Sequence, residues 1–178
     1  MPFVHKYALL INYVFQGSKE GKNAWKIRKD AMEIVLASLE SCGGIISCAP
    51  TCIPGLVELV KVIAERLGDS QSNLKPLAAT LIRSIFASVT SELKVKLGRI
   101  VFPYLVNAAL TDSKQTMRDA AMTALVAGTT KKESEGGGPN SASLETFLAV
   151  FVSSIKEADF KVSSSLHFYF IFVEGLGM

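Results

Sequence analysis

The sequence repeats one short pattern at intervals of 43 to 47 residues, which constrains the fold more than any other feature. The segment DSQSNLKPLAATLI, from Asp69, aligns without a gap with DSKQTMRDAAMTAL, from Asp112. NAWKIRKDAMEIV, from Asn23, joins them so that Arg28 matches Lys75, and ADFKVSSSLHFYF is a weaker fourth copy. A period in the forties is typical of helix pairs that stack on one another.

Each matched segment is expected to be a second helix, preceded by an apolar first helix. Before the second copy, PGLVELVKVIAERLG has apolar residues at the i, i+3, i+4, i+7 spacing of a helix with one buried face. These residues are Leu56, Leu59, Val60, Ile63 and Leu67. Before the third copy, LGRIVFPYLVNAALTD is apolar, and Pro103 is expected to kink or restart the helix. Asp69, Ser70, Asp112 and Ser113 fall at the turns, where their side chains can cap helix N–H groups.

The unit is therefore helix, short turn, helix, and one such pair cannot cover its own apolar face. Stacked pairs bury a shared seam, so the sequence predicts an all-α fold, an α-solenoid of HEAT-like helix pairs. Neighbouring helices are expected to approach closely at Ala31, Ala78 and Ala121, and the first copy should also turn Ile27 and Ile34 inward.

The whole chain, residues 1–178, is expected to be one domain. The helix pairs are placed at about 3–44, 53–90, 92–129 and 144–174, and a flexible insertion at 129–143 separates the last two. The fourth pair is a poor copy, so the domain is expected to be incomplete at its C-terminal end. The insertion's GGG has no strand before it and no P-loop lysine after it, which argues against phosphate binding.

Composition excludes several classes of function. With 49% hydrophobic and 20% charged residues the chain is a globular protein, and a net charge of +3 is too small for an obvious nucleic-acid binder. The start is too broken by polar residues for a signal peptide or membrane span, and the apolar run 166–173 is too short for a span. We expect no nucleic-acid or membrane partner.

No catalytic or metal site is expected, nor any cofactor. His5 and His167 are isolated in the sequence, and none of the cysteines has a histidine nearby. No carboxylate pair has the surroundings of an active site, so an enzyme is not expected. Cys42, Cys48 and Cys52 have a spacing that matches no familiar zinc pattern, and their odd number without a secretory signal favours reduced thiols in the cytosol. Their role is not evident from the sequence.

The turn sequences indicate which family of HEAT-like repeats the chain resembles. WKIRK opening the second helix of the first pair, followed by GDSQSNLK and TDSKQTMRDAAMTAL at the same place in later pairs, resembles a TOG domain over roughly residues 20 to 128. TOG domains are HEAT-repeat modules of the microtubule polymerase and CLASP families, and the likeness is greatest to the fourth TOG domain of the polymerases. The resemblance implies a cytoplasmic, cytoskeletal protein of microtubules, the spindle or the microtubule-organising centre.

In that family the turns line up along one edge, which binds the αβ-tubulin dimer, and the early repeats face β-tubulin. The resemblance implies a contribution to microtubule growth or organisation. Carried over to this chain, the edge consists of Asn23, Trp25 and Lys26 from the first turn, Ser70, Asn73 and Lys75 from the second, Ser113, Lys114 and Arg118 from the third, and Phe160 and Lys161 from the weak fourth copy.

Alternatives remain open for several of these residues. Trp25 is either a contact held out to a partner or a core residue that clamps the first two helices, and its match to the polar Ser72 and Gln115 favours contact. The basic residue that recurs as Arg28, Lys75 and Arg118 either contacts the partner or pairs with an acid of the next unit. For the whole chain, the alternatives are a generic HEAT scaffold for another protein and a structural piece that self-associates through Phe168, Phe170 and Phe172.

Overall fold

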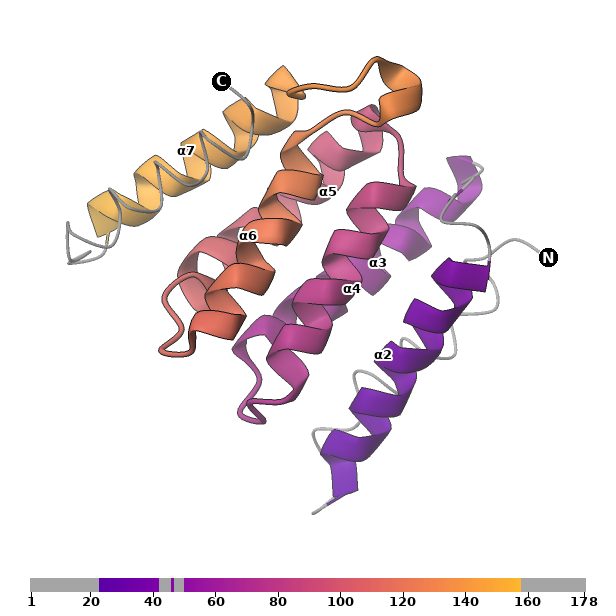
Figure 1. The fold of residues 1–178 in the computed structure, drawn as a ribbon, viewed down its shortest axis with the longest axis vertical. Helices are drawn as coiled ribbons and strands as arrows, with labels where there is room; N and C mark the ends of the chain where they lie inside the picture. Colours follow the sequence, from indigo (N-terminus) through magenta and orange to yellow (C-terminus); the bar gives the residue numbers. More distant parts are fainter. Residues whose placement is uncertain (1–22, 42–45, 47–49, 158–178) are drawn as a thin grey trace.

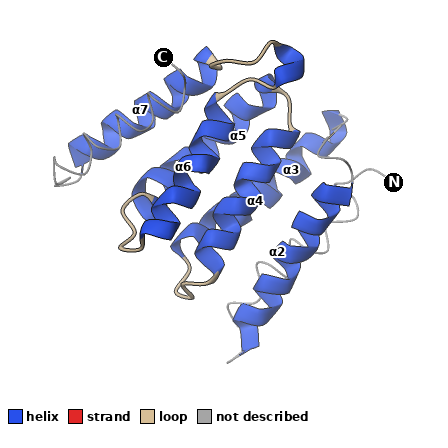
Figure 2. Ribbon diagram, in the orientation of Figure 1, coloured by secondary structure: helices blue, strands red, loops and turns tan. Residues whose placement is uncertain are grey.

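The computed structural model describes residues 23–41, 46 and 50–157, and within them the fold is all-α, as predicted. Six α-helices follow one another in this part of the chain: α2 (Ala24–Ser41), α3 (Ile53–Glu65), α4 (Leu74–Ser88), α5 (Ser91–Tyr104), α6 (Gln115–Thr129) and α7 (Ser141–Glu157). Short helical turns cover Pro50–Cys52, Arg66–Gly68 and Glu133–Glu135, and a π-helical segment covers Leu105–Ala109. Loops join these elements, and no strand is drawn among the described residues (Figure 2).

The helices form two layers (Figure 1). In one layer α4 packs between α2 and α6, and in the other α5 packs between α3 and α7. The layers meet where α3 contacts α4 and α5 contacts α6, so successive helix pairs stack side by side. These contacts between neighbouring helices fit the solenoid that the repeat predicts.

The predicted close approach of the helices is confirmed. Ala31 is 3% exposed, and Ala78 and Ala121 are fully buried where α2, α4 and α6 lie against one another. The apolar stripe expected on α3 is also buried along its length. Small side chains at the repeated position allow neighbouring helix backbones to pack closely.

The predicted inward direction of Ile34 is wrong, because this side chain is 49% exposed. The buried residues of α2 are Ala24, Arg28, Ala31, Met32, Val35 and Leu39. At about 100° per residue, these fill an arc to one side of Ala31, whereas Ile34 projects on the other side. Ile27 lies on the same flank as Ile34 and is half-buried.

Four phenylalanines join α4, α5 and α7 through the centre of the core. The ring centroids of Phe86 and Phe102 are 5.9 Å apart, those of Phe102 and Phe147 are 5.8 Å apart, and those of Phe147 and Phe151 are 5.6 Å apart. Gly98 makes room for this series, since a Cβ atom there would lie 2.6 Å from the Phe102 ring. The aromatic contacts therefore tie α7 to the two preceding helix pairs.

Pro103 was expected to kink or restart its helix. α5 runs through Pro103 to Tyr104, and the backbone widens immediately afterwards into the π-helical segment. There the Leu110 N–H donates to the Leu105 carbonyl at 2.9 Å, five residues back instead of four. Proline supplies no N–H to the helical ladder, so the irregular pairing begins next to it.

The segment expected to be a flexible insertion folds back on the repeats as a hairpin-like loop, residues 130–139, which we call the 130–139 hairpin. Thr130 and Pro139 form an isolated antiparallel bridge, and the turn uses three glycines with φ of 94°, 61° and 77°. Such positive φ values are easy only for glycine. The GGG therefore makes the tight return.

Side chains fasten this hairpin to the corner between α4 and α5. Lys132 Nζ donates to the Ser88 carbonyl at 2.8 Å, and the Glu135 carboxylate accepts from the backbone N–H and the hydroxyl of Ser91. From α5, Lys94 Nζ donates to the Thr130 carbonyl at 2.7 Å. Burial lowers the pKa of Lys94 from its ordinary value, and the nearby charge of Lys132 lowers this pKa further.

Candidate functional site: the turn edge

The turns that precede α4 and α6, and the start of α2, lie at one end of the layer that these helices form (Figure 1). Near that end Arg28 of α2 contacts Asp69, in the turn before α4, and Lys75 of α4 contacts Asp112, in the turn before α6. At the other end the Ile46 N–H donates to the Ser88 carbonyl at 3.0 Å. The three helices therefore run parallel, and their starts form one edge, which we call the turn edge.

A buried ion pair connects the first two units at this edge. Arg28 Nε lies 3.1 Å from Asp69 Oδ2, and Arg28 Nη2 donates a hydrogen bond to Asp69 Oδ1 at 3.3 Å. Arg66 Nη1 lies 3.3 Å from the same Oδ2, and the Gln71 N–H donates to Oδ1 at 2.9 Å. Arg28 and Asp69 are only 6% and 7% exposed. The Asp69 carboxylate thus fixes its own turn and joins it to α2, the second helix of the preceding unit.

A second ion pair, which we call the second rung, repeats this arrangement between α4 and the turn before α6, closer to solvent. Lys75 Nζ lies 2.9 Å from Asp112 Oδ2, and the Lys114 N–H donates to Asp112 Oδ1 at 2.9 Å. The backbone hydrogen bond from Lys114, followed by the side-chain hydrogen bond from Lys75, holds the pKa of Asp112 below its usual range. The side chains of Lys75 and Asp112 are 24% and 10% exposed.

These two ion pairs bear on whether the recurring basic residue contacts a partner or pairs with an acid of the next unit. Arg28 and Lys75 both pair with an acid of the next unit, and so they form a ladder along the edge. Arg118, the third basic residue of the series, fastens its own turn, because its Nη1 donates to the carbonyls of Asp112 at 2.7 Å and Ser113 at 3.0 Å and its Nη2 to the Gln115 side chain. The predicted edge residues Lys75 and Arg118 are therefore engaged within the chain.

The remaining described edge residues are accessible. Asn23, Lys26, Ser70, Asn73, Ser113 and Lys114 are all exposed. Trp25 is half-buried and packs against the hydrophobic core, and Lys26 Nζ lies 5.8 Å from the centroid of its ring. Part of the Trp25 side chain therefore lies against the core, and the rest is exposed to solvent. Phe160 and Lys161 lie outside the described residues.

The site residues carried over by the resemblance omit three exposed neighbours at this edge. Gln71 and Ser72 stand in the second turn, and Thr116 lies at the start of α6. All three belong to the gapless alignment of the repeats, with Ser72 at the position of Trp25 and Thr116 at that of Lys26. The alignment could have added them to the edge.

Neither a membrane span nor a metal cluster is found in the described part of the chain. None of its helices is both long and apolar enough to cross a membrane. Its Cys, Asp and Glu side chains do not form groups of three that could hold a metal ion. Cys52 is a half-buried free thiol, and Cys42, Cys48 and both histidines lie outside the described residues.

Comparison of the chain with protein-family models, with curated proteins and with solved structures finds no match. The likeness to a TOG domain therefore depends on the repeat register and the turn sequences of this chain.

Proposed function

We propose that the chain is a helical-repeat module that binds αβ-tubulin through its turn edge and contributes to microtubule growth or organisation. The observation that carries this proposal is the alignment of the starts of α2, α4 and α6 at one end, with exposed polar side chains at each and exposed lysines at the first and third. The identity of the partner comes from the turn sequences, which resemble those of TOG domains.

The ladder of ion pairs supports a role in binding because it makes the edge rigid. Asp69 and Asp112 each hold a turn by a backbone hydrogen bond at 2.9 Å and an adjoining helix by an ion pair. The spacing between the turns is thus set before a partner arrives. A preformed surface loses less conformational entropy on binding than a flexible one.

The exposed charged residues of the predicted edge set are both lysines, which suits an acidic partner. Lys26 and Lys114 are exposed, one at the first turn and one at the third. Exposed lysines steer and orient a partner more than they hold it, and salt weakens their effect. The half-buried indole of Trp25 would supply the larger part of the affinity, as buried aromatic anchors do in other interfaces.

Gel filtration of the chain with soluble αβ-tubulin tests this proposal. The wild-type chain should co-elute with tubulin at low ionic strength, and both Trp25→Ala and the double substitution Lys26→Glu, Lys114→Glu should reduce the co-eluting fraction. Lys131→Glu, an exposed lysine in the 130–139 hairpin, is the matched control and should leave binding unchanged. Circular dichroism establishes that each variant is folded. Absence of co-elution at micromolar tubulin would refute tubulin binding by this chain.

A generic scaffold for another protein is the second candidate, and the engagement of Lys75 and Arg118 within the chain favours it. Their pairing leaves fewer free basic groups at the edge than the family likeness implies. Under this alternative, an edge-dependent partner other than tubulin should bind, and tubulin should not. The phenylalanines proposed for self-association, Phe168, Phe170 and Phe172, lie outside the described residues.

A further inference from the structure

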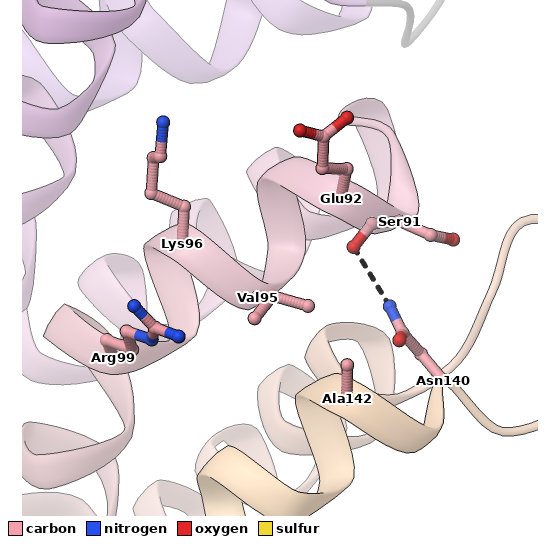
Figure 3. Close-up of a pocket in the computed structure, with 7 residues that line it drawn as sticks. All are labelled: Ser91, Glu92, Val95, Lys96, Arg99, Asn140 and Ala142. Atoms are coloured by element: carbon pink, nitrogen blue, oxygen red, sulfur yellow. Dashed lines mark hydrogen bonds between the residues drawn. The ribbon is translucent and has the colours of Figure 1, made fainter.

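A shallow groove opens between the starts of α5 and α7, at the end of the repeats opposite to the turn edge (Figure 3). α5 begins directly after α4 ends, so its first turn lies far from the turn that precedes α4. The groove has a volume of about 380 Å³ and is lined by Ser91, Glu92, Val95, Lys96, Arg99, Asn140 and Ala142. This volume lies within the range of sites that hold small ligands or single side chains of a peptide.

The groove is apolar along its floor and charged along its rim. Val95 of α5 and Ala142 of α7 face each other across it (Figure 3). Lys96 and Arg99 are exposed and three residues apart on α5, so they lie on neighbouring positions of the helix surface. Glu92 stands one turn before Lys96, at the end of the groove near Asn140.

The walls of the groove are held in place without a ligand. Asn140 is only 6% exposed, its Nδ2 donates to the Ser91 carbonyl at 3.0 Å, and its Oδ1 accepts from the Ser143 N–H at 3.4 Å. Glu135 of the 130–139 hairpin accepts hydrogen bonds from Ser91 on the same corner. The first turns of α5 and α7 are therefore fastened to each other, and the groove between them is preformed.

We propose that this groove binds a short segment of a partner protein in which an apolar side chain is followed by acidic ones. The apolar side chain lies against Val95 and Ala142, and the carboxylates pair with Lys96 and Arg99. Glu92 repels acid at the other end, so the acidic end of the segment points along α5 towards Arg99. The groove has two cations, an apolar floor and the Glu92 carboxylate, and this combination fits such a peptide. A nucleic-acid backbone would require a run of basic contacts.

This site is separate from the turn edge, so the chain could hold two partners at once. An acidic peptide at the groove would leave Lys26 and Trp25 accessible. The proposal does not depend on tubulin being the partner at the turn edge.

Fluorescence anisotropy with three synthetic peptides tests the proposal on the full chain. The probe is a labelled peptide with one leucine followed by two glutamates, flanked by glycine and serine. A second peptide has glutamine for both glutamates, and a third has serine for the leucine. The wild-type chain should bind the first peptide more tightly than either of the others, because the groove uses both the charges and the apolar contact.

Two groove variants and one control complete the test. The double substitution Lys96→Glu, Arg99→Glu should weaken binding of the probe by about tenfold or more, which corresponds to about 1.4 kcal/mol. Ala142→Trp should weaken it by filling the groove, and this exposed position in the first turn of α7 tolerates a large side chain. Arg83→Glu, an exposed arginine on α4 in the other layer, should leave binding unchanged.

Three results would overturn the proposal. The first is equal binding of the glutamate and glutamine peptides, and the second is an unchanged affinity in the charge-reversed variant when circular dichroism shows it to be folded. The third is a dimer in analytical ultracentrifugation that Ala142→Trp dissolves while no peptide binds, since the groove would then belong to a second copy of the chain.

Discussion

The substitution Asp69→Asn removes a negative charge that two arginines share while preserving the size of the side chain. In the folded chain the Asp69 carboxylate lies 3.1 Å from Arg28 Nε and 3.3 Å from Arg66 Nη1, and it accepts the Gln71 N–H at 2.9 Å. The asparagine oxygen can still accept one hydrogen bond. It cannot balance the charge of Arg28, which is only 6% exposed.

The expected decrease in the free energy of unfolding follows from the burial of Arg28. Removing one partner of a buried ion pair costs about 3–5 kcal/mol, and the retained amide oxygen places Asp69→Asn near the lower value, about 3 kcal/mol. Asp112→Asn makes the same chemical change at the second rung, where Lys75 is 24% exposed and solvent compensates part of the charge. The loss there should be about 1 kcal/mol. The two isosteric substitutions should therefore differ by roughly 2 kcal/mol.

Urea denaturation followed by far-ultraviolet circular dichroism measures both losses as changes in the free energy of unfolding. Comparable slopes with denaturant would show that the variants unfold from similarly compact states. Asp30→Asn, at an exposed position of α2, is the matched control and should change stability by less than about 0.5 kcal/mol. Equal losses for Asp69→Asn and Asp112→Asn, or a loss at Asp69 as small as that of the control, would refute the reasoning from burial.

Two further predictions concern the second rung and the aromatic core. The pKa of Asp112 is lowered from 3.8, so the stability that its carboxylate contributes is fully present above that value and is lost as the pH falls through the lower folded-state pKa. The difference in unfolding free energy between wild type and Asp112→Asn should hence be constant near neutral pH and narrow below about pH 4, and a difference that widens in acid would contradict the assignment. Gly98→Val should destabilise the chain by about 2 kcal/mol in the same assay, because a Cβ atom would lie 2.6 Å from the ring of Phe102. Gly68→Ala, where a Cβ atom meets open space, is its control and should be close to neutral.

The sequence predicted the parts of the fold that depend on local periodicity. The repeat register placed Ala31, Ala78 and Ala121 where neighbouring helices meet, and all three are buried there. The same register was too coarse for Ile34, since the buried arc of a helix depends on the angle at which its neighbours approach. That angle is a property of the stacked helices and not of one segment.

The positions of the residues at the candidate edge could be predicted from the sequence, but the ion pairs between them could not. Basic and acidic residues recur at fixed places in the repeats, but Arg28 meets Asp69 only because stacking brings residues 41 positions apart into contact. A sequence cannot tell whether such an arginine contacts a partner or the next unit. Similarly, Lys132 and Glu135 fall in the segment expected to be a flexible insertion, because the corner at Ser88 and Ser91 that receives them is 44 residues away in the sequence.

The attachment of the 130–139 hairpin has a consequence for how the chain unfolds. In a simple solenoid each unit contacts only its neighbours, and end units can fray one at a time. Here the loop between α6 and α7 is fastened to the corner between α4 and α5. The hydrogen bonds that fasten it are made by Lys94, Lys132 and Asn140. Separation of α7 breaks the Asn140–Ser91 hydrogen bond together with the phenylalanine contacts. The bonds of Lys94 and Lys132 join the end of α6 to the same corner, which raises the cooperativity between units. The chain from α4 to α7 should therefore lose its structure in one step, with amide exchange in α5 and α7 reporting the same opening free energy.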